Sequence, residues 1–340
     1  MASEEARAVA GSGTGDRAGW RRLAADRGDQ GRRLDLVVHR HLRDLPSATR
    51  TQVQIWIRAG QVRVNGVPAN RASARVALGD LIAVALPGGA ARLAPAAEPG
   101  RLSILHEDEH LLAVDKPPGI VVHPTYRHPT GTLLNMLVWH LRECRAGQRP
   151  SIVGRLDKGT SGIVLVAKTA AMHAALQRAM ASPTSRKDYL AVVYGRMTGG
   201  VGRISARLKL HADRRRMIVA PDGADAETCV ERLADVPAPR PGLSVLRCRL
   251  VTGRRHQIRA HLAWRGWPIV GDPVYGAARW EAVQDPELAE ALRTFPRQAL
   301  HAWTLALVHP ATARPLAIDA PIPEDLRTLL ESSSPRILTC

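Results

Sequence analysis

The sequence predicts an α+β protein with more than one folded unit, and three observations support this prediction. Segments with strand-like and helix-like periodicity interleave along the 340 residues, without the regular strand–helix–strand spacing of a parallel sheet. The length is sufficient for about two domains. A stretch rich in proline, glycine and alanine, "GGAARLAPAAEPG" at residues 88–100, separates a small basic segment from a larger one.

These boundaries define the expected domain organisation. Ala-, Gly- and Arg-rich residues without sustained periodicity predict a flexible tail over residues 1–31. We expect a small domain over residues 32–87, the linker over 88–100, a large domain over 101–330 and a second tail over 331–340.

The charge of the chain favours a polyanionic partner. Lysine and arginine total 48 against 31 aspartates and glutamates, which gives a formal net charge of +17. An excess of this kind is typical of proteins that bind nucleic acid or an acidic membrane surface. Because the basic residues are mostly arginine and alanine is abundant, a genomic composition bias is an alternative explanation.

Cysteine usage and the N-terminal sequence predict a cytoplasmic protein. No CxxC pair occurs among the cysteines, which excludes a typical disulfide framework or structural zinc site; they are Cys144, Cys229, Cys248 and Cys340. The first residues, "MASEEARAVAGSG", lack the apolar core of a signal peptide. No apolar stretch approaches the roughly 18 residues that suggest a membrane span. No glycine-rich nucleotide motif is present, so we expect no cofactor.

The small domain has a predicted order of two helices and a β-hairpin. Leu34, Val37, Val38 and Leu42 recur at helical spacing, and a second apolar set follows around Trp56. The segment "QVRVNG" alternates like a strand and ends in an Asn-Gly turn, and "DLIAVAL" predicts a further strand. Residues 32–87 contain nine arginines and no lysine against three aspartates.

The large domain begins with segments typical of strands. "HLLAVDKPPGIVVHP", residues 110–124, predicts a strand, a turn over 116–119 and another strand. "GIVLVAK" and "DYLAVVYGR" predict two more strands. Between them, "TAAMHAALQRAMAS" predicts a helix that ends before Pro183.

One window, "IVGRLDKGTSGIVLVAK" at residues 152–168, places a single carboxylate against an apolar run. Asp157 has Arg155 and Lys158 beside it and precedes two glycines and a Thr-Ser pair. A simple turn explains such residues through local hydrogen bonds. A carboxylate at the mouth of a buried strand is also a candidate catalytic group, and this window alone leaves both interpretations open.

Three windows together indicate an activity. They are "GRLDKGTSG" with Asp157, "RKDYLAVVYG" with Tyr189, and "VTGRRHQIRAHLAWRGWPIVGDPVYG" with Arg259. With "VDKPPGIVVHP" and the closing "RQALHAWTLALVHPATARPLAIDAPIPEDL", they resemble the pseudouridine synthases, in particular the large-subunit ribosomal RNA type. The resemblance covers residues 101–326.

The resemblance implies a pseudouridine synthase fold, a mixed and mainly antiparallel sheet with a central cleft. It also implies an enzyme that isomerises uridine in RNA to pseudouridine and that works on a flipped-out base. The essential aspartate of the family falls on Asp157, its active-site aromatic on Tyr189 and the basic partner of the aspartate on Arg259. A carboxylate can act as nucleophile because it divides a difficult displacement into easier steps.

Each of these roles has a plainer alternative. A nearby guanidinium would keep a partly buried aspartate ionised, which is the role expected for Arg259. Arg254 and Arg255 compete for that role, and Tyr189 could be a core residue of a strand. A metal site is not expected, because no carboxylate cluster accompanies the neighbouring histidines.

The small domain resembles the αL RNA-binding module first recognised in a ribosomal small-subunit protein, most specifically in "IRAGQVRVNG". That resemblance makes Arg50, Arg58 and Arg63 candidate phosphate contacts, although a solvated basic face explains any single one. In the large domain we expect four further RNA-binding residues: Arg155, Arg254, Arg255 and His256.

Two positions depart from the family pattern. Gly154 stands where the family usually has histidine, and Gly159 stands where it often has an acid. These departures bear on the choice of RNA target more than on covalent chemistry. Ribosomal RNA is the favoured substrate and the chain is expected to be a monomer. Transfer RNA remains an alternative, as does a binding or ribosome-assembly factor that has lost catalysis. A hydrolase of another glycosidic bond would normally need a second acid.

Overall fold

The computed structural model divides the chain into two compact units, Met1–Ala94 and Pro95–Cys340. The division falls inside the predicted linker, whose residues 88–94 lie outside the part of the chain that the structure describes. The described residues are 20–26, 29–42, 45, 48–86, 95–125, 128–142, 149–197, 199, 201–213, 215–236, 242–276 and 279–333.

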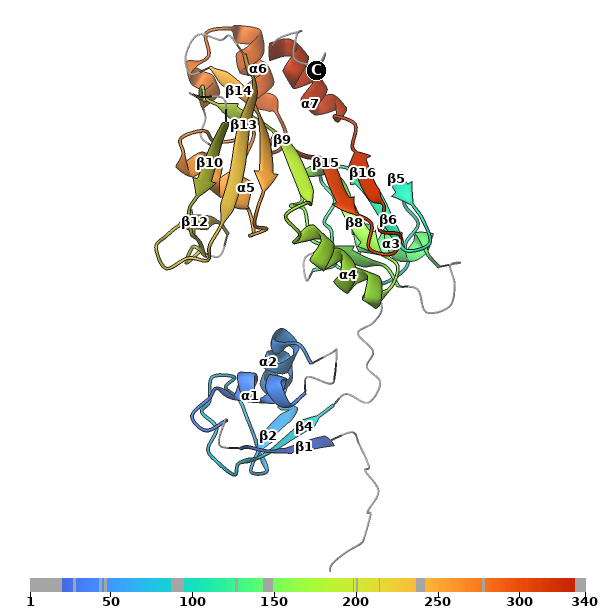
Figure 1. Ribbon diagram of the computed structural model, residues 1–340. Helices are drawn as coiled ribbons and strands as arrows, with labels where there is room; N and C mark the ends of the chain where they lie inside the picture. Colours follow the sequence, from blue (N-terminus) through green and yellow to red (C-terminus); the bar gives the residue numbers. More distant parts are fainter. Residues whose placement is uncertain are drawn as a thin grey trace, which may run out of the picture. The chain divides into compact units, whose positions relative to one another are not determined.

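The N-terminal unit packs two helices on one face of a four-stranded sheet (Figure 1). The helices are α1 (Leu34–His41) and α2 (Arg50–Arg58), and the sheet has the order β1 (Trp20–Ala24), β4 (Leu81–Ala85), β2 (Val62–Val64), β3 (Val67–Pro68). Asn65 and Gly66 both have positive φ angles, 51° and 83°, as a tight hairpin with an Asn-Gly turn requires. The predicted helices and hairpin are therefore present.

Strand β1 corrects the prediction of a flexible tail over residues 1–31. It pairs antiparallel with β4 along its whole length, and Leu23 and Ala25 contribute to the core. The strand is held mainly by hydrogen bonds to a partner about 60 residues away in the chain, which a local sequence window does not reveal. Residues 1–19 of the predicted tail lie outside the described residues.

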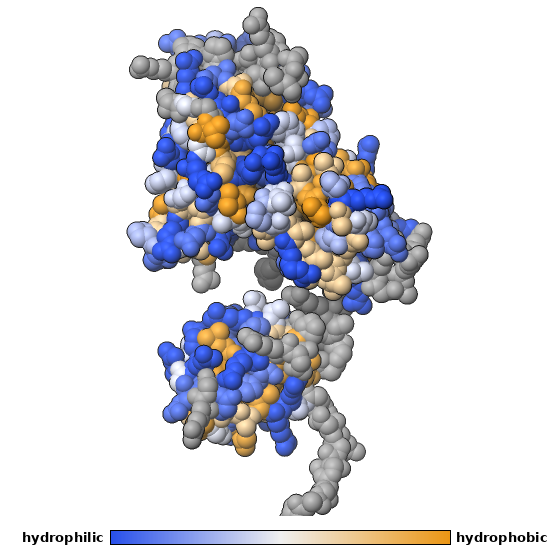
Figure 2. All heavy atoms as spheres, viewed as in Figure 1, coloured by the Kyte–Doolittle hydropathy of each residue, from blue (hydrophilic) through white to orange (hydrophobic). Residues whose placement is uncertain are grey.

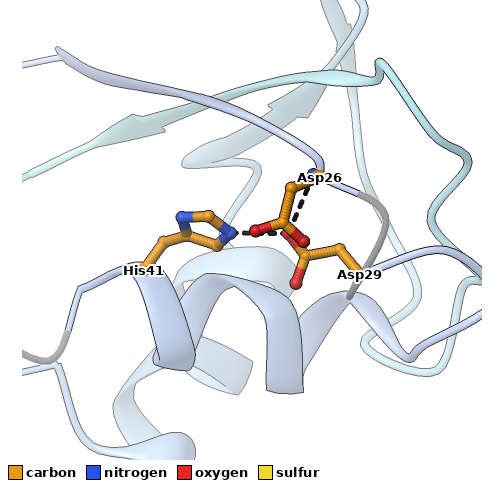
Figure 3. A group of neighbouring side chains, drawn as sticks. All are labelled: Asp26, Asp29 and His41. Atoms are coloured by element: carbon orange, nitrogen blue, oxygen red, sulfur yellow. Dashed lines mark hydrogen bonds and ion pairs between the residues drawn. The ribbon is translucent and has the colours of Figure 1, made fainter.

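A cluster of charged side chains joins the loop after β1 to helix α1. Figure 3 shows His41 directed at the carboxylates of Asp26 and Asp29, with His41 Nε2 2.6 Å from Asp29 Oδ2. Arg40 also donates to both carboxylates, at 3.1 and 2.7 Å. Burial raises the pKa of Asp29, but hydrogen bonds from His41 and Arg40 outweigh it and lower the pKa. The Arg40 guanidinium pairs with both carboxylates, so the cluster is an ion-pair network that links the loop after β1 to helix α1.

The C-terminal unit is built on one ten-stranded sheet. Its main path runs β10 (Val201–Ser205), β13 (Glu227–Val236), β14 (Leu243–Leu250), β9 (Arg186–Tyr194), β15 (Leu300–Val308), β8 (Ser161–Ala167), β6 (Leu111–Lys116), β5 (Ser103–Glu107). Two strands pair off this path, β16 (Pro315–Asp319) with β15 and β7 (Ser151–Val153) with β8. A separate hairpin consists of β11 (Leu208–Leu210) and β12 (Met217–Val219).

Helices flank this sheet and cover its apolar residues. They are α3 (Leu133–His140), α4 (Ala170–Met180), α5 (Gln257–Trp264), the 3-10 helix η1 (Arg279–Ala282), α6 (Pro286–Thr294) and α7 (Glu324–Ser333). Helix α4 packs against β7 and β8, whereas α6 packs against α7 at the opposite end of the unit (Figure 1). Helix α5 contacts β12 and β13 and carries Arg259, and three further predicted site residues, Arg254, Arg255 and His256, directly precede it.

Strands β8 and β15 form a parallel pair, whereas the other strand pairs of this sheet among the described residues are antiparallel. Gly162 lies at this junction with φ +104°, and a Cβ at this position would come within 2.2 Å of the Ala302 carbonyl oxygen. Only glycine permits that approach and that backbone angle together. This requirement explains the second glycine of "GTSG".

Three expectations for the C-terminal unit need correction. Residues 120–124 are not a strand. The carbonyls of Val121 and Val122 accept hydrogen bonds from the first backbone N–H groups of α3 and not from a neighbouring strand. Residues 331–333 belong to α7 and not to a tail. Residues 95–100 of the predicted linker attach to this unit, where Asn135 Nδ2 donates to the Ala96 carbonyl and Glu98 accepts from Gly131 N.

Apolar side chains lie mostly inside. On the face visible in Figure 2, hydrophilic residues predominate and apolar residues form separate small patches. Among the described residues, no helix has both the length and the apolar composition needed to span a bilayer.

Candidate active site

Asp157 lies in the loop that joins β7 to β8, shortly before the first residue of β8, which is an inner strand of the sheet. Thr160 N donates to the Asp157 carbonyl at 3.0 Å, so the backbone forms a turn, and Gly154 enters it with φ +80°. The Asp157 carboxylate takes no part in that turn bond. The turn interpretation and the catalytic interpretation are therefore compatible.

Buried cations hold the carbonyls that follow Asp157. Lys116 Nζ donates to the Lys158 carbonyl at 3.2 Å, and Gly119 N donates to the same oxygen at 2.8 Å. Arg297 Nη1 donates to the Gly159 carbonyl at 3.1 Å. Burial lowers the pKa of Lys116 to about 8, and the Arg297 charge adds to this effect. The loop is thus fixed from two sides, which restrains Asp157.

The carboxylate of Asp157 forms an ion pair with Arg259, which α5 presents. Arg259 Nη1 lies 2.7 Å from Asp157 Oδ2, and the Asp157 side chain is 18% exposed. On its other edge, Arg259 donates from Nε and Nη2 to both oxygens of Asp272, at 2.7 and 2.8 Å. A planar guanidinium suits this arrangement because it bonds two carboxylates at once.

This geometry separates Arg259 from its competitors. Arg254 donates to the Asp225 carbonyl and Arg255 donates to the Arg215 carbonyl, and both side chains are exposed. Burial alone would lower the pKa of Arg259, but the Asp272 and Asp157 carboxylates outweigh burial and raise it. Arg259 is therefore charged at any physiological pH and balances the charge of Asp157.

Two cavities meet at Asp157. The first has a volume of about 800 Å³ and is lined by Asp157, Tyr189, Lys187 and Arg254, among others. The second, of about 780 Å³, shares Asp157, Arg155 and Arg259 with the first and extends toward Arg297. These volumes are in the range of small-molecule sites, so one nucleotide can be accommodated.

Tyr189 is buried on β9 and lines the first cavity with Asp157. Lys187 Nζ lies 5.5 Å from the centre of its ring. Because Tyr189 is 5% exposed and belongs to the core cluster, the packing interpretation also holds.

The predicted RNA-binding residues are distributed over both units. Arg155, Arg254 and Arg255 are exposed around the first cavity, and His256 lies deeper, with Nε2 3.7 Å from Asp157 Oδ1. His256, one of the expected RNA-binding residues, thus lines the first cavity and also lies beside the Asp157 carboxylate.

The three arginines of the N-terminal unit do not form one patch. Arg50 pairs with the buried carboxylate of Asp35 at 3.3 Å, which gives it a partner inside the unit. Arg58 is exposed at the end of α2. In β2, Val62 is buried against the helices, so Arg63 points to the opposite face of the sheet, where it stacks on Trp20 at 5.0 Å.

Comparisons with known proteins identify the family of this chain. The model of a family described as RNA pseudouridylate synthase matches residues 110–264, and the S4 domain model matches residues 32–82. Ribosomal large subunit pseudouridine synthase D of Xanthomonas campestris pv. campestris is 39% identical, over 89% of this chain and 89% of the relative. The chain belongs to the RNA pseudouridylate synthase family.

Other relatives give the same result. The protein of the same name from Pseudomonas aeruginosa is 36% identical, over 88% of this chain and 91% of the relative. Among solved structures, human RNA pseudouridylate synthase domain containing 4 aligns with a TM-score of 0.53 at 21% identity, covering 67% of this chain and 92% of that chain. The likeness to the human protein concerns the fold. The chain is thus an RNA pseudouridine synthase with an S4 domain, and its substrate is RNA.

Sequence reasoning missed three groups around the site of this pseudouridine synthase. They are Lys116, Asp272 and Tyr275. A signal for Asp272 was available, because it follows the apolar run of "WPIVGDPVYG" much as Asp157 accompanies its own run. Lys116 and Tyr275 gave no comparable signal, since a lysine before two prolines and a tyrosine in a turn are ordinary residues.

Proposed function

We propose that this synthase isomerises specific uridines of large-subunit ribosomal RNA to pseudouridine, with Asp157 as the nucleophile acting on a flipped-out uridine. The names of the relatives support the ribosomal target. The observation that carries the role of Asp157 is its ion pair with Arg259, at the meeting point of two cavities.

The geometry leaves one carboxylate oxygen for chemistry. Oδ2 accepts from Arg259, whereas Oδ1 has no partner within hydrogen-bond distance among the described residues. In the isomerisation, the bond between uracil N1 and ribose C1′ breaks, and a bond between C5 and C1′ forms. The proton on C5 leaves and N1 gains one, so the reaction balances without an oxidant or reductant. A charged carboxylate beside the reacting ring divides this exchange into easier steps.

Tyr189 supplies the other side of the proposed base site. Its ring offers a stacking surface within the first cavity, and its hydroxyl can carry the proton that leaves C5. Extruding a base from folded RNA costs a few kcal/mol. Stacking on the ring and phosphate contacts from Arg155, Arg254 and Arg255 offset this cost. Action on ribosomal RNA would place the protein in the cytoplasm with its substrate.

Replacement of the nucleophile tests the role of Asp157. Asp157→Asn keeps the size of the side chain but removes its nucleophilic charge, so we expect no detectable pseudouridine while RNA affinity stays within about twofold. Release of tritium from uridine labelled at C5 measures turnover. Asp225→Asn, at an exposed aspartate, is the matched control and should retain full activity. Turnover at the wild-type rate in Asp157→Asn would refute the proposed mechanism.

Mapping of pseudouridine identifies the target. We expect that deletion of the gene removes pseudouridine from one or a few sites of large-subunit ribosomal RNA, and that the wild-type gene restores them. Carbodiimide-dependent stops in primer extension measure each site in ribosomal and transfer RNA. A change confined to transfer RNA would contradict the ribosomal target and leave the enzyme class intact.

A further inference from the structure

His256 lies in an unusual backbone conformation beside the reacting carboxylate. It is the residue that precedes α5, and its φ and ψ angles are 51° and 21°, in the left-handed region. Non-glycine residues seldom adopt this conformation, which costs about 1 kcal/mol or more. The left-handed turn directs the imidazole inward, so the side chain is only 11% exposed and Nε2 faces Asp157 Oδ1.

Tyr275 contacts the other nitrogen of the imidazole. The Tyr275 hydroxyl lies 3.2 Å from His256 Nδ1, and the two rings meet edge to face with centroids 5.8 Å apart. The same hydroxyl oxygen accepts a hydrogen bond from Met217 N of β12 at 2.6 Å. The phenol keeps its proton because burial raises the pKa of Tyr275.

These contacts favour one of the two ring nitrogens as the site of the proton. Since the Tyr275 oxygen accepts from Met217 N, its own O–H is free to donate, and His256 Nδ1 is the adjacent acceptor. A neutral imidazole that accepts at Nδ1 carries its proton on Nε2. That N–H faces Asp157 Oδ1 at 3.7 Å, just beyond a hydrogen bond. In the other tautomer, Nε2 would have no proton, and its lone pair would face the negative Asp157 carboxylate.

The turn that holds Tyr275 depends on the same ion-pair network. Asp272 Oδ1 accepts from the backbone N–H groups of Val274 and Tyr275, at 2.9 and 3.0 Å, while both Asp272 oxygens accept from Arg259. The Arg259 guanidinium lies 5.2 Å from the centre of the Tyr275 ring. Asp272 therefore positions two residues of the site. It orients Arg259, which bonds Asp157 Oδ2, and it orients Tyr275, which contacts His256.

We propose that His256 is a positioning residue for the nucleophile, with Tyr275 fixing its Nε2–H tautomer. Arg259 holds one oxygen of Asp157 and the His256 N–H faces the other, so the two groups together favour one orientation of the carboxylate. The charged and titratable groups that face His256 are Asp157, Arg255, Arg259, Asp272 and Tyr275. Rate, and not RNA affinity, should depend on this histidine.

The test separates this role from a contact with RNA. Bulk RNA from a strain lacking the gene contains the natural target whichever RNA class carries it, so the assay does not depend on the ribosomal assignment. The measurements are the single-turnover rate of pseudouridine formation at saturating enzyme, and the RNA dissociation constant from filter binding.

We expect His256→Ala to lower the rate about 10- to 100-fold, since loss of orientation at a reacting group has effects of this size. The dissociation constant should stay within about twofold. His256→Gln should recover part of the rate, because its amide N–H can reach the position of Nε2–H. Tyr275→Phe should lower the rate less than His256→Ala, and Tyr194→Phe, a buried tyrosine in β9 outside both cavities, serves as control.

A spectroscopic measurement makes the proposal independent of turnover. Long-range proton–nitrogen NMR of histidine-labelled protein should show the Nε2–H tautomer for the resonance that His256→Gln removes. Tyr275→Phe should convert it to a mixture. A loss of RNA affinity with an unchanged saturated rate in His256→Ala would overturn the proposal, as would an unchanged rate or an Nδ1–H tautomer. If His256→Ala does not fold, His256→Gln, Tyr275→Phe and the NMR result decide.

Discussion

At the residue scale, the site depends on one guanidinium that serves two carboxylates. Arg259 is 4% exposed and donates to Asp157 with one nitrogen and to Asp272 with two. Breaking a buried, hydrogen-bonded ion pair costs roughly 3–5 kcal/mol, because it leaves a charge without a partner. The active form of Asp157 is therefore coupled to the integrity of the Asp272 turn.

A lysine at this position cannot reproduce the geometry. An ammonium lacks the planar fork that bonds two carboxylates, so we expect Arg259→Lys to lower the single-turnover rate about 100-fold or more and to change RNA affinity little. Arg265→Lys, at the exposed end of the same helix, is the control and should retain activity. A rate within threefold of wild type would show that charge alone suffices beside Asp157.

At the element scale, the junction of β8 and β15 brings the Asp157 loop beside the strand that follows Gln298. The junction requires Gly162, whose substitution would force a Cβ against the Ala302 carbonyl. We expect Gly162→Ala to lower the free energy of unfolding by about 3 kcal/mol, from overpacking together with a strained φ. Gly253→Ala, where a Cβ would meet no atom within 4 Å, is the matched control in urea denaturation. Equal stability of the two variants would contradict the close approach.

The same junction buries a neutral histidine. His301 Nδ1 lies 2.9 Å from Ser161 Oγ, and burial lowers the pKa of His301 to about 4. The unfolded chain, with a pKa near 6.5, then binds more protons than the folded chain between pH 4 and 6.5. Stability is therefore lost as the pH falls through that window, by about 3 kcal/mol in total for this residue.

The variant His301→Asn tests this linkage. Asparagine can keep the bond to Ser161 but does not titrate, so its unfolding free energy should depend less steeply on pH between 4 and 6.5 than that of the wild type. Denaturant titrations at several pH values measure the difference. Other buried histidines contribute equally to the pH dependence of both proteins, so their contribution cancels in the comparison. Parallel curves would mean that His301 is protonated in the fold.

At the scale of the whole molecule, positive charge is shared by two units that have separate cores. The three candidate arginines of the N-terminal unit, Arg50, Arg58 and Arg63, are all exposed, and Arg50 in addition forms an ion pair with the buried carboxylate of Asp35. Arg63 lies on the sheet face opposite the helices, whereas Arg58 lies at the end of helix α2, so these two arginines belong to different surfaces of the unit. The salt dependence of binding can distinguish the two surfaces.

Single substitutions show which arginine contacts phosphate. If Arg58 lies on the RNA, Arg58→Gln should reduce the slope of log affinity against log salt by about 1, and Arg63→Gln should leave it unchanged. Filter binding from low to moderate salt measures the slope. Arg71→Gln, an exposed arginine of the same unit, removes the same charge and should leave the slope unchanged. An equal change in all three would indicate a diffuse effect of net charge.

The sequence by itself determined the α+β class, the helices and the Asn-Gly hairpin of the small unit, and the family. These follow from local periodicity, turn residues and ordered motifs, which short windows contain. It also pointed to Arg259 as the partner of Asp157, through resemblance, although the two lie 102 residues apart.

Only the tertiary structure decided which groups surround that pair. It added Asp272 and Tyr275, placed His256 beside the Asp157 carboxylate, and brought β1 into the sheet in place of a tail. Such contacts depend on how distant strands and turns pack, and the free energy that favours them comes from partners outside any local window. A residue's neighbours in space, unlike its neighbours in the chain, exist only after folding.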